Sequence, residues 1–303
     1  MRYLLNIGNT RTAVGVGVPG SDGFAMEFHS TVGFGEAWSP SAPDGGWHAV
    51  AASVVPAARR ALEARFPGRF HFISAEDFPW IDCSAYDMPR LGADRLANIA
   101  AAHRLSPGRA VLVVDCGTAL NSVCVSPDGR FLGGVILPGR GTALRSLAKD
   151  TAQLPEFSVA ATHELNPLGL TSEDAIRNGV DIGILGAAEA IVRKTRALPE
   201  MRGCRVWFTG GDAPFPPAAH TIRSLPGRRG KGGPPIKGRP ARMPAVWFRG
   251  YILGIFSRTI LSASRFQSPL WRLQASSSSA KTGSVLPFSA KSAIAVSGKS
   301  WWV

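Results

Sequence analysis

Two short stretches of the 303-residue chain decide its fold: Asn6-Ile7-Gly8-Asn9-Thr10 near the N-terminus and Asp115-Cys116-Gly117-Thr118-Ala119 in the middle. Each follows a short apolar run and precedes a β-like run, a turn rich in Pro, Gly and Asp, and another apolar run. Both copies therefore predict the same order of strand, glycine-containing hairpin tip, strand, turn and strand. One such hairpin is ordinary, but two in the same order indicate an internal duplication.

The residue types at these tips favour phosphate binding. A glycine lets the backbone pass close to a ligand, and hydroxyl and amide neighbours donate hydrogen bonds. An acidic residue at the strand end can hold a cation or its water shell. Two such hairpins that face each other would bind a polyphosphate from both sides. No G-x-x-x-x-G-K-[ST] stretch is present, which excludes a P-loop.

We therefore expect an α/β chain of two similar halves around a nucleotide cleft. This arrangement resembles the actin-like fold of the acetate and sugar kinase, Hsp70 and actin superfamily. The halves are predicted at residues 1–108 and 109–256, the second with a flexible basic loop at about 214–242. Residues 257–303 match neither half.

The segments between the two copies predict helices and strands in alternation. Spacings of three and four apolar residues predict a helix over 96–105, which places Asp94 and Arg95 in its first turn. A carboxylate there either stabilises the helix end or acts as a general base. Capping-box spacing predicts a second long helix that starts after Thr171 and ends near Arg196. The other expected elements are strands at 47–53, 70–74, 131–136 and 206–208 and helices at 56–66 and 142–149.

Together these pieces resemble the type III pantothenate kinases. Five motifs of that family occur in order: D-x-G-N-T at 6–10, G-x-D-R at 92–95, D-x-G-T-A at 115–119, G-G-x-I-x-P-G at 133–139 and G-G-D-A at 210–213. Each motif alone is weak, whereas the set is specific. The resemblance implies an ATP- and Mg²⁺-dependent kinase with an alcohol acceptor. It would phosphorylate pantothenate to 4'-phosphopantothenate, the first step of coenzyme A biosynthesis.

The resemblance also implies roles for individual residues, and a homodimer with its cation and substrate sites near the interface. Asp94 would be the catalytic base, and Asp115 would bind a monovalent cation, K⁺ or NH₄⁺. ATP would be held by Asn6, Gly8, Asn9, Thr10, Arg11 and Thr118. Pantothenate would be held by Tyr86, Gly92, Ala93, Asp94, Arg95 and Ser172.

Two positions depart from the family pattern and keep other functions open. Asn6 stands where the family has Asp, and Val123 stands where it often has the Asp of T-x-D. Loss of carboxylates weakens Mg²⁺ binding in a phosphoryl-transfer site. One alternative is therefore a catalytically weakened relative that binds nucleotide or pantothenate as a regulator. Another is a different small-molecule kinase of the same superfamily.

Cysteine content and hydropathy limit the functions that this chain can have. The four cysteines lack C-x-x-C spacing, which argues against disulfide and zinc frameworks. No apolar run approaches the roughly 18 residues of a membrane span, and the N-terminus does not look like a signal peptide. We expect a cytoplasmic protein.

The C-terminal part of the chain carries the whole excess of positive charge. The net charge is +13, yet residues 213–303 contain 14 Lys and Arg and no acidic residue. The preceding part is close to neutral, so nucleic acid is not the expected partner. Residues 257–303 fit three interpretations: a disordered basic tail, a contact for nucleic acid or an anionic surface, or an artefact of the reading frame.

Overall fold

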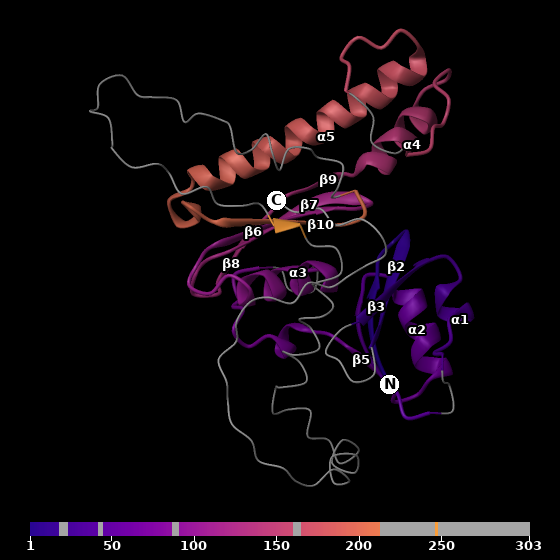
Figure 1. Cartoon of the computed structure of the whole chain (residues 1–303), viewed down its shortest axis with the longest axis vertical. Coiled ribbons are helices and arrows are strands. Elements are labelled where there is room, and N and C mark those ends of the chain that lie inside the picture. Colours follow the sequence, from indigo (N-terminus) through magenta and orange to yellow (C-terminus); the bar gives the residue numbers. More distant parts are fainter. Residues whose placement is uncertain (18–23, 42–44, 87–90, 160–164, 213–245, 248–303) are drawn as a thin grey trace. The chain divides into compact units, whose positions relative to one another are not determined.

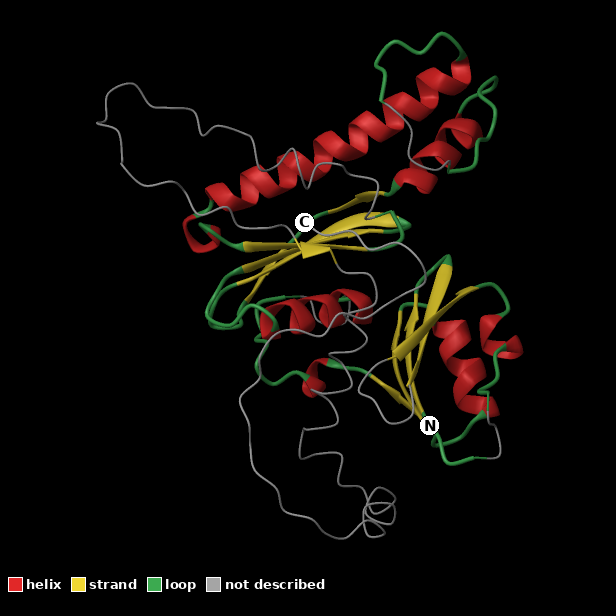
Figure 2. Cartoon of the chain, viewed as in Figure 1, coloured by secondary structure: helices red, strands yellow, loops and turns green. Residues whose placement is uncertain are grey.

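The computed structural model describes residues 1–17, 24–41, 45–86, 91–159 and 165–212 and the backbone of Val246–Trp247 (Figures 1 and 2). All of these belong to one unit, Met1–Leu261. The predicted flexible loop at about 214–242 and the predicted tail at 257–303 lie outside the described residues. So does the turn expected at 19–23.

The first sheet has five strands in the order β3-β2-β1-β4-β5. Strand β2 pairs antiparallel with β1 and β3, whereas β4 pairs parallel with β1 and β5. The strands are β1 (Arg2–Ile7), β2 (Arg11–Gly17), β3 (Phe24–Ser30), β4 (His48–Ser53) and β5 (Phe70–Phe72). The strands predicted at the first hairpin are therefore confirmed.

Helices α1 (Phe34–Ala37) and α2 (Pro56–Arg65) pack on this sheet (Figure 2). Pro56 begins α2, where its missing N–H costs no hydrogen bond. An aromatic cluster fills the core between helices and sheet, with Trp38 and Trp47 ring centroids 6.0 Å apart. The sequence pattern does not predict the short helix α1.

The second sheet repeats the path of the first. Its order is β11-β10-β6-β7-β8, with antiparallel pairs along β6-β7-β8 and parallel pairs along β6-β10-β11. The strands are β6 (Val111–Cys116), β7 (Ala119–Val125), β8 (Phe131–Gly133), β9 (Ile136–Pro138), β10 (Arg205–Thr209) and β11 (Val246–Trp247). Because β6, β7 and β8 correspond to β1, β2 and β3, the predicted duplication is confirmed.

One predicted strand is wrong in its extent. The run 131–136 forms two short strands, β8 and β9, both of which pair with β7. The register shifts at Cys124, and a Cβ on Gly134 would lie closer than 3.0 Å to the carbonyl oxygen of Ser122. The chain therefore bends against β7 at Gly134 before it pairs again.

Helices cover both faces of the second sheet, with α3 (Ala93–Arg104) on one face and α5 (Ser172–Ala197) on the other (Figure 2). Alternate residues of β6 point to α5, where Leu112 and Val114 pack with Ile184 in one core. Helix α4 (Arg140–Asp150) packs beside α5. The short 3-10 helices are η1 (Ala75–Asp77) and η3 (Pro199–Met201).

Local signals explain where these helices begin. The Thr171 hydroxyl accepts a hydrogen bond from the backbone N–H of Asp174 at 3.1 Å, as the predicted cap of α5 requires. Among the described residues, no helix is long and apolar enough to cross a membrane.

The start of α4 yields a first prediction. A Cβ on Gly139 would lie closer than 3.0 Å to the carbonyl oxygens of Gly117 and Thr118, whereas a Cβ on Gly141 would meet only the ends of two side chains. Gly139→Ala should therefore lower the free energy of unfolding by about 2 kcal/mol or more. Gly141→Ala, the matched control, should leave it unchanged or raise it by up to about 1 kcal/mol. Urea unfolding of both variants checks this, and equal stabilities would contradict it.

Candidate functional site

The tips of the two duplicated hairpins meet. The hydroxyl groups of Thr10 and Thr118 are 2.9 Å apart and share a hydrogen bond, although the residues are 108 positions apart in the chain. The Thr142 hydroxyl of α4 donates to the carbonyl oxygen of Thr118 at 2.7 Å. The two polar tips, predicted to act together, therefore lie side by side.

The first tip presents polar groups around a tight backbone turn. The N–H of Gly8 donates to the carbonyl oxygen of Arg11 at 3.2 Å, and the side chains of Asn9 and Arg11 are exposed. Asn6 lies at the end of β1, where its Oδ1 atom is buried and has no hydrogen-bond partner. A buried acceptor without a donor is unusual and marks a place where a ligand donor or a cation would fit.

Asp115 occupies the corresponding strand end of the second half. Its Oδ2 accepts from Nδ2 of Asn98 at 3.0 Å. A Cβ on Gly210 would lie 2.5 Å from Oδ1, so only glycine fits there, at a φ of 96°. The pKa of Asp115 is raised to about 6, because burial and the charge of Asp94 raise it more than hydrogen bonds from Asn98 and Asn121 lower it.

Asp94 lies in the first turn of α3, as predicted. Its Oδ1 accepts from the backbone N–H of Arg95 at 2.7 Å, and a Cβ on Gly92 would lie 2.5 Å from the same oxygen. Ala93 begins the helix. Burial raises the pKa of Asp94, against the opposing effects of the Arg95 N–H and charge. The structure thus brings two desolvated carboxylates, Asp94 and Asp115, within electrostatic reach of each other.

Arg95 and Tyr86, both predicted to hold pantothenate, contact each other. Nη1 of Arg95 donates to the Tyr86 hydroxyl at 3.2 Å, and the guanidinium carbon lies 5.6 Å from the centre of the Tyr86 ring. The Nε atom of Arg95 is buried without a hydrogen-bond partner. The Tyr86 ring packs edge-on against Phe131 of β8, with centroids 4.9 Å apart. Asp82 holds this segment at the sheet edge, because its N–H donates to the carbonyl oxygen of Gly129 and its carbonyl oxygen accepts from the N–H of Phe131.

Ser172 is the predicted site residue that this single chain does not bring to the others. It begins α5 and is exposed, and no contact in the described part of the chain joins it to Asp94, Arg95 or the hairpin tips.

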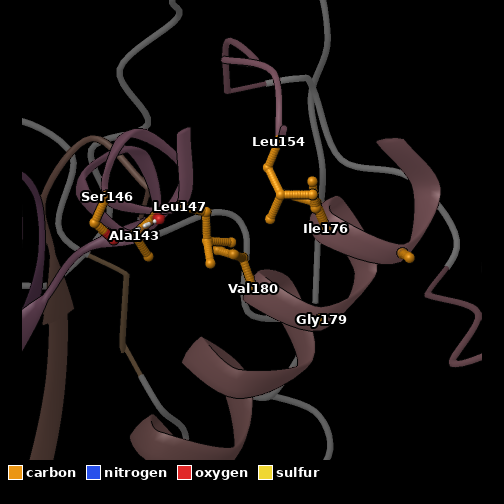
Figure 3. Close-up of a pocket in the computed structure, with 8 residues that line it drawn as sticks. Ala143, Ser146, Leu147, Leu154, Ile176, Gly179 and Val180 are labelled. Atoms are coloured by element: carbon orange, nitrogen blue, oxygen red, sulfur yellow. Dashed lines mark hydrogen bonds between the residues drawn. The ribbon is translucent and has the colours of Figure 1, made fainter. Parts of the chain in front are cut away.

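A pocket of about 500 Å³ lies between α4 and α5 (Figure 3). Its lining is apolar apart from Ser146: Ala143, Leu147, Leu154, Ala175, Ile176, Gly179 and Val180. None of the predicted site residues lines this pocket.

Sequence reasoning missed three residues at the site: Asn98 and Asn121 contact Asp115, and Thr142 holds the second tip. It placed Asp212 in the G-G-D-A motif after β10 but gave it no role. Burial raises the pKa of Asp212, while the charges of Arg140 and Arg11 lower it. Two signals were available: Asn98 lies four residues after Asp94 on a predicted helix, and Asn121 lies opposite Asp115 in a predicted hairpin.

The comparisons with known proteins now identify the family. The family model for type III pantothenate kinases matches residues 3–194, which include both hairpins, Asp94 and Asp115. The chain belongs to the type III pantothenate kinase family.

Two members of the type III pantothenate kinase family show the extent of the likeness. The type III pantothenate kinase of Synechococcus elongatus is 37% identical over 161 residues, which are 53% of this chain and 61% of that protein. The type III pantothenate kinase of Chlorobium luteolum is 40% identical over 177 residues, which are 55% of this chain and 64% of that protein. The chain thus spans about three fifths of the length of these relatives.

A solved structure shows the same fold. A Campylobacter jejuni protein described as a Baf family transcriptional activator matches with a TM-score of 0.53 and 18% sequence identity, over 87% of this chain and 100% of that one. With the repeated sheet order, this establishes the duplicated actin-like α/β fold expected for a type III pantothenate kinase.

The raised pKa of Asp115 predicts a pH-dependent gain of stability in Asp115→Asn. Because burial raises this pKa from 3.8 to about 6, the native chain binds more protons than the unfolded chain between these values. Stability therefore falls as pH rises through this window, and Asp115→Asn removes the loss. At pH 7.5 we expect Asp115→Asn to have a higher Tm than the wild type and a free energy of unfolding that is larger by about 1–3 kcal/mol. Near pH 4 this difference should disappear.

A control separates this effect from the loss of any carboxylate. The Ser126 hydroxyl lowers the pKa of exposed Asp128, so Asp128→Asn should leave stability unchanged or reduce it slightly. Thermal melts of both variants at pH 4 and pH 7.5 make the comparison. An Asp115→Asn variant that melts below the wild type at pH 7.5 would contradict the account.

Proposed function

We propose that this chain transfers the γ-phosphoryl group of ATP to the primary hydroxyl of pantothenate and so forms 4'-phosphopantothenate. One observation carries the proposal: two desolvated carboxylates, Asp94 and Asp115, come together beside two polar hairpin tips. Membership of the type III pantothenate kinase family supports the choice of substrate. The reaction is the entry to coenzyme A biosynthesis.

Asp94 serves as the general base in this proposal. A kinase needs one carboxylate within hydrogen-bond reach of the attacking hydroxyl, and a raised pKa brings that group closer to the working pH. Burial raises the pKa of Asp94, while the Arg95 N–H holds one of its oxygens. This carboxylate would accept the proton of the substrate hydroxyl.

Arg95 binds the pantothenate carboxylate. The residue is 6% exposed, its guanidinium donates to the Tyr86 hydroxyl, and its Nε lacks a partner. A planar guanidinium with a spare donor suits a carboxylate ligand. Gly92 and Ala93 line the same helix start, where a substrate can approach the backbone closely.

The hairpin tips fit the phosphates of ATP. Hydroxyl groups of Thr10 and Thr118, with the exposed Arg11 and Asn9, supply donors at adjacent positions. When bound, ATP with Mg²⁺ supplies the phosphoryl group and neutralises the developing charge. Mg²⁺ commonly keeps several waters and uses one or two carboxylates plus phosphates. The described residues contain no group of three or more His, Cys, Asp and Glu side chains that could hold a metal ion.

Asp115 is the proposed ligand of a monovalent cation, K⁺ or NH₄⁺. A cation near its carboxylate would offset the burial that raises its pKa. The buried Oδ1 atoms of Asn6 and Asn121, which have no hydrogen-bond partner, are further acceptors of the kind such a cation uses.

The four cysteines are free, which agrees with a reducing, cytoplasmic compartment.

A second candidate function rests on Asn6 and Val123. Asn6 carries no charge at the strand end that corresponds to Asp115, and Val123 is fully buried in β7, where a carboxylate would be costly. A chain without these carboxylates could bind nucleotide or pantothenate as a regulator without turnover.

We infer a homodimer, because Ser172 is separated from the other site residues and large apolar side chains are exposed around the start of α5. Leu168, Leu170 and Ile182 are 76%, 95% and 40% exposed. Ile182→Glu should convert the dimer to a monomer in sedimentation velocity, whereas Arg193→Glu on the exposed polar part of the same helix should not. A monomeric wild-type chain would contradict the inference.

Release of ADP by the purified chain with ATP, Mg²⁺ and pantothenate tests the proposed function. We expect K⁺-dependent turnover that falls at least 100-fold in Asp94→Asn, since general-base catalysis contributes roughly 10²–10⁴-fold. Turnover that appears only in Asn6→Asp would indicate a kinase fold with a weakened Mg²⁺ site. Tight binding of ATP or pantothenate with no turnover in either chain would favour the regulatory function.

A further inference from the structure

Asn98 lies between the two carboxylates of the proposed site. It follows Asp94 by one helical turn, so both side chains lie on the same face of α3. Asn98 is 4% exposed, and its Nδ2 donates to Oδ2 of Asp115 at 3.0 Å. This hydrogen bond ties the helix that carries one carboxylate to the strand that carries the other.

The two oxygens of Asp115 have different surroundings. Oδ2 is held by Asn98, whereas Oδ1 faces backbone: a Cβ would lie 2.5 Å from it on Gly210 and 3.6 Å from it on Gly117. Both glycines lie where side chains are absent, next to the second hairpin tip. Asn98 therefore holds the carboxylate through Oδ2, while Oδ1 lies against the glycine-lined backbone.

A second amide acts on the same carboxylate. Asn121 lies opposite Asp115 in the pairing of β6 with β7 and hydrogen bonds to it. Since a carboxylate only accepts, the amide nitrogen of Asn121 faces Asp115, and its buried Oδ1 is left without a partner. Donors on β7 and α3 thus restrict rotation of the Asp115 side chain from two elements.

We propose that Asn98 is a positioning residue for phosphoryl transfer, which fixes Asp115 so that Oδ1 faces the glycine-lined hairpin tip where nucleotide and monovalent cation bind. Asn98 need not touch either ligand, because it acts through Asp115. This inference rests on the proposed function and adds a residue on α3 to a binding site otherwise built from hairpin tips.

The first test replaces the amide by an apolar side chain of similar size. Asn98→Leu should raise the Kd for ADP, measured by calorimetry in KCl, by about tenfold, the effect of losing one hydrogen bond to a charged group. It should also reduce the rise in Tm that KCl produces over NaCl without nucleotide. In turnover, the KM for ATP should rise more than the KM for pantothenate.

A double-mutant cycle distinguishes positioning from a merely structural role. If Asn98 acts through Asp115, Asn98→Leu should add little to the loss of ADP affinity already caused by Asp115→Asn. Additive losses in the double variant would overturn the inference. The cycle uses binding, so it does not depend on turnover.

Two further variants show whether a loss of ADP affinity in Asn98→Leu comes from unfolding. Ser106→Ala removes a buried hydroxyl at the end of α3, which accepts from Nε1 of Trp207 at 3.0 Å, and it should lower Tm while ADP affinity stays unchanged. If Asn98→Leu does not fold, Asn98→Ser should show the same loss of affinity, because serine is too short to reach Asp115. Unchanged affinity in Asn98→Ser would overturn the inference.

The outcome for the wild type separates the two proposals. A wild-type chain that binds ADP but shows an additive cycle would overturn the role of Asn98 alone. A wild-type chain that neither binds ADP nor turns over would overturn the proposed function and the role of Asn98 with it.

Discussion

The close approach of three backbone segments at the second hairpin is the constraint on which the rest of the structure depends. Gly139, at the start of α4, lies against the carbonyl oxygens of Gly117 and Thr118, and Gly210, after β10, lies against that of Cys116. No side chain fits at either point. The glycines of separate motifs therefore serve one purpose, which is to let a helix start and a strand end close around one hairpin tip.

That constraint determines the electrostatics of the site. With backbone packed on one side and α3 on the other, Asp115 is largely desolvated, and its pKa rises. A buried carboxylate with a raised pKa costs folding free energy at neutral pH, which is typical of a group kept for binding or catalysis. Hydrogen bonds from the amides of Asn98 and Asn121 lower the pKa and so offset part of this rise.

Much of the fold and of the candidate site could be predicted from the sequence, because the informative patterns are local. Each hairpin is a contiguous strand, glycine and strand, and the first turn of α3 follows from apolar spacing, so Asp94 and Asp115 were found. The division of 131–136 into two strands was not predicted, because it depends on contact between Gly134 and β7. The role of Asn98 was also missed, since it requires knowing that α3 covers β6.

Ser172 marks the limit of reasoning from a single chain. Its position before α5 follows from the Thr171 cap, yet the fold of one chain leaves it away from Asp94 and Arg95. Its predicted role in substrate binding therefore cannot be derived from local pattern or from the packing of one chain.

Transfer of label from [γ-³²P]ATP to pantothenate tests the central claim most directly. The account predicts labelled phosphopantothenate with the wild-type chain in K⁺ and almost none with Asp94→Asn. Label that stays in ATP, or appears only as inorganic phosphate in the presence of pantothenate, would contradict it.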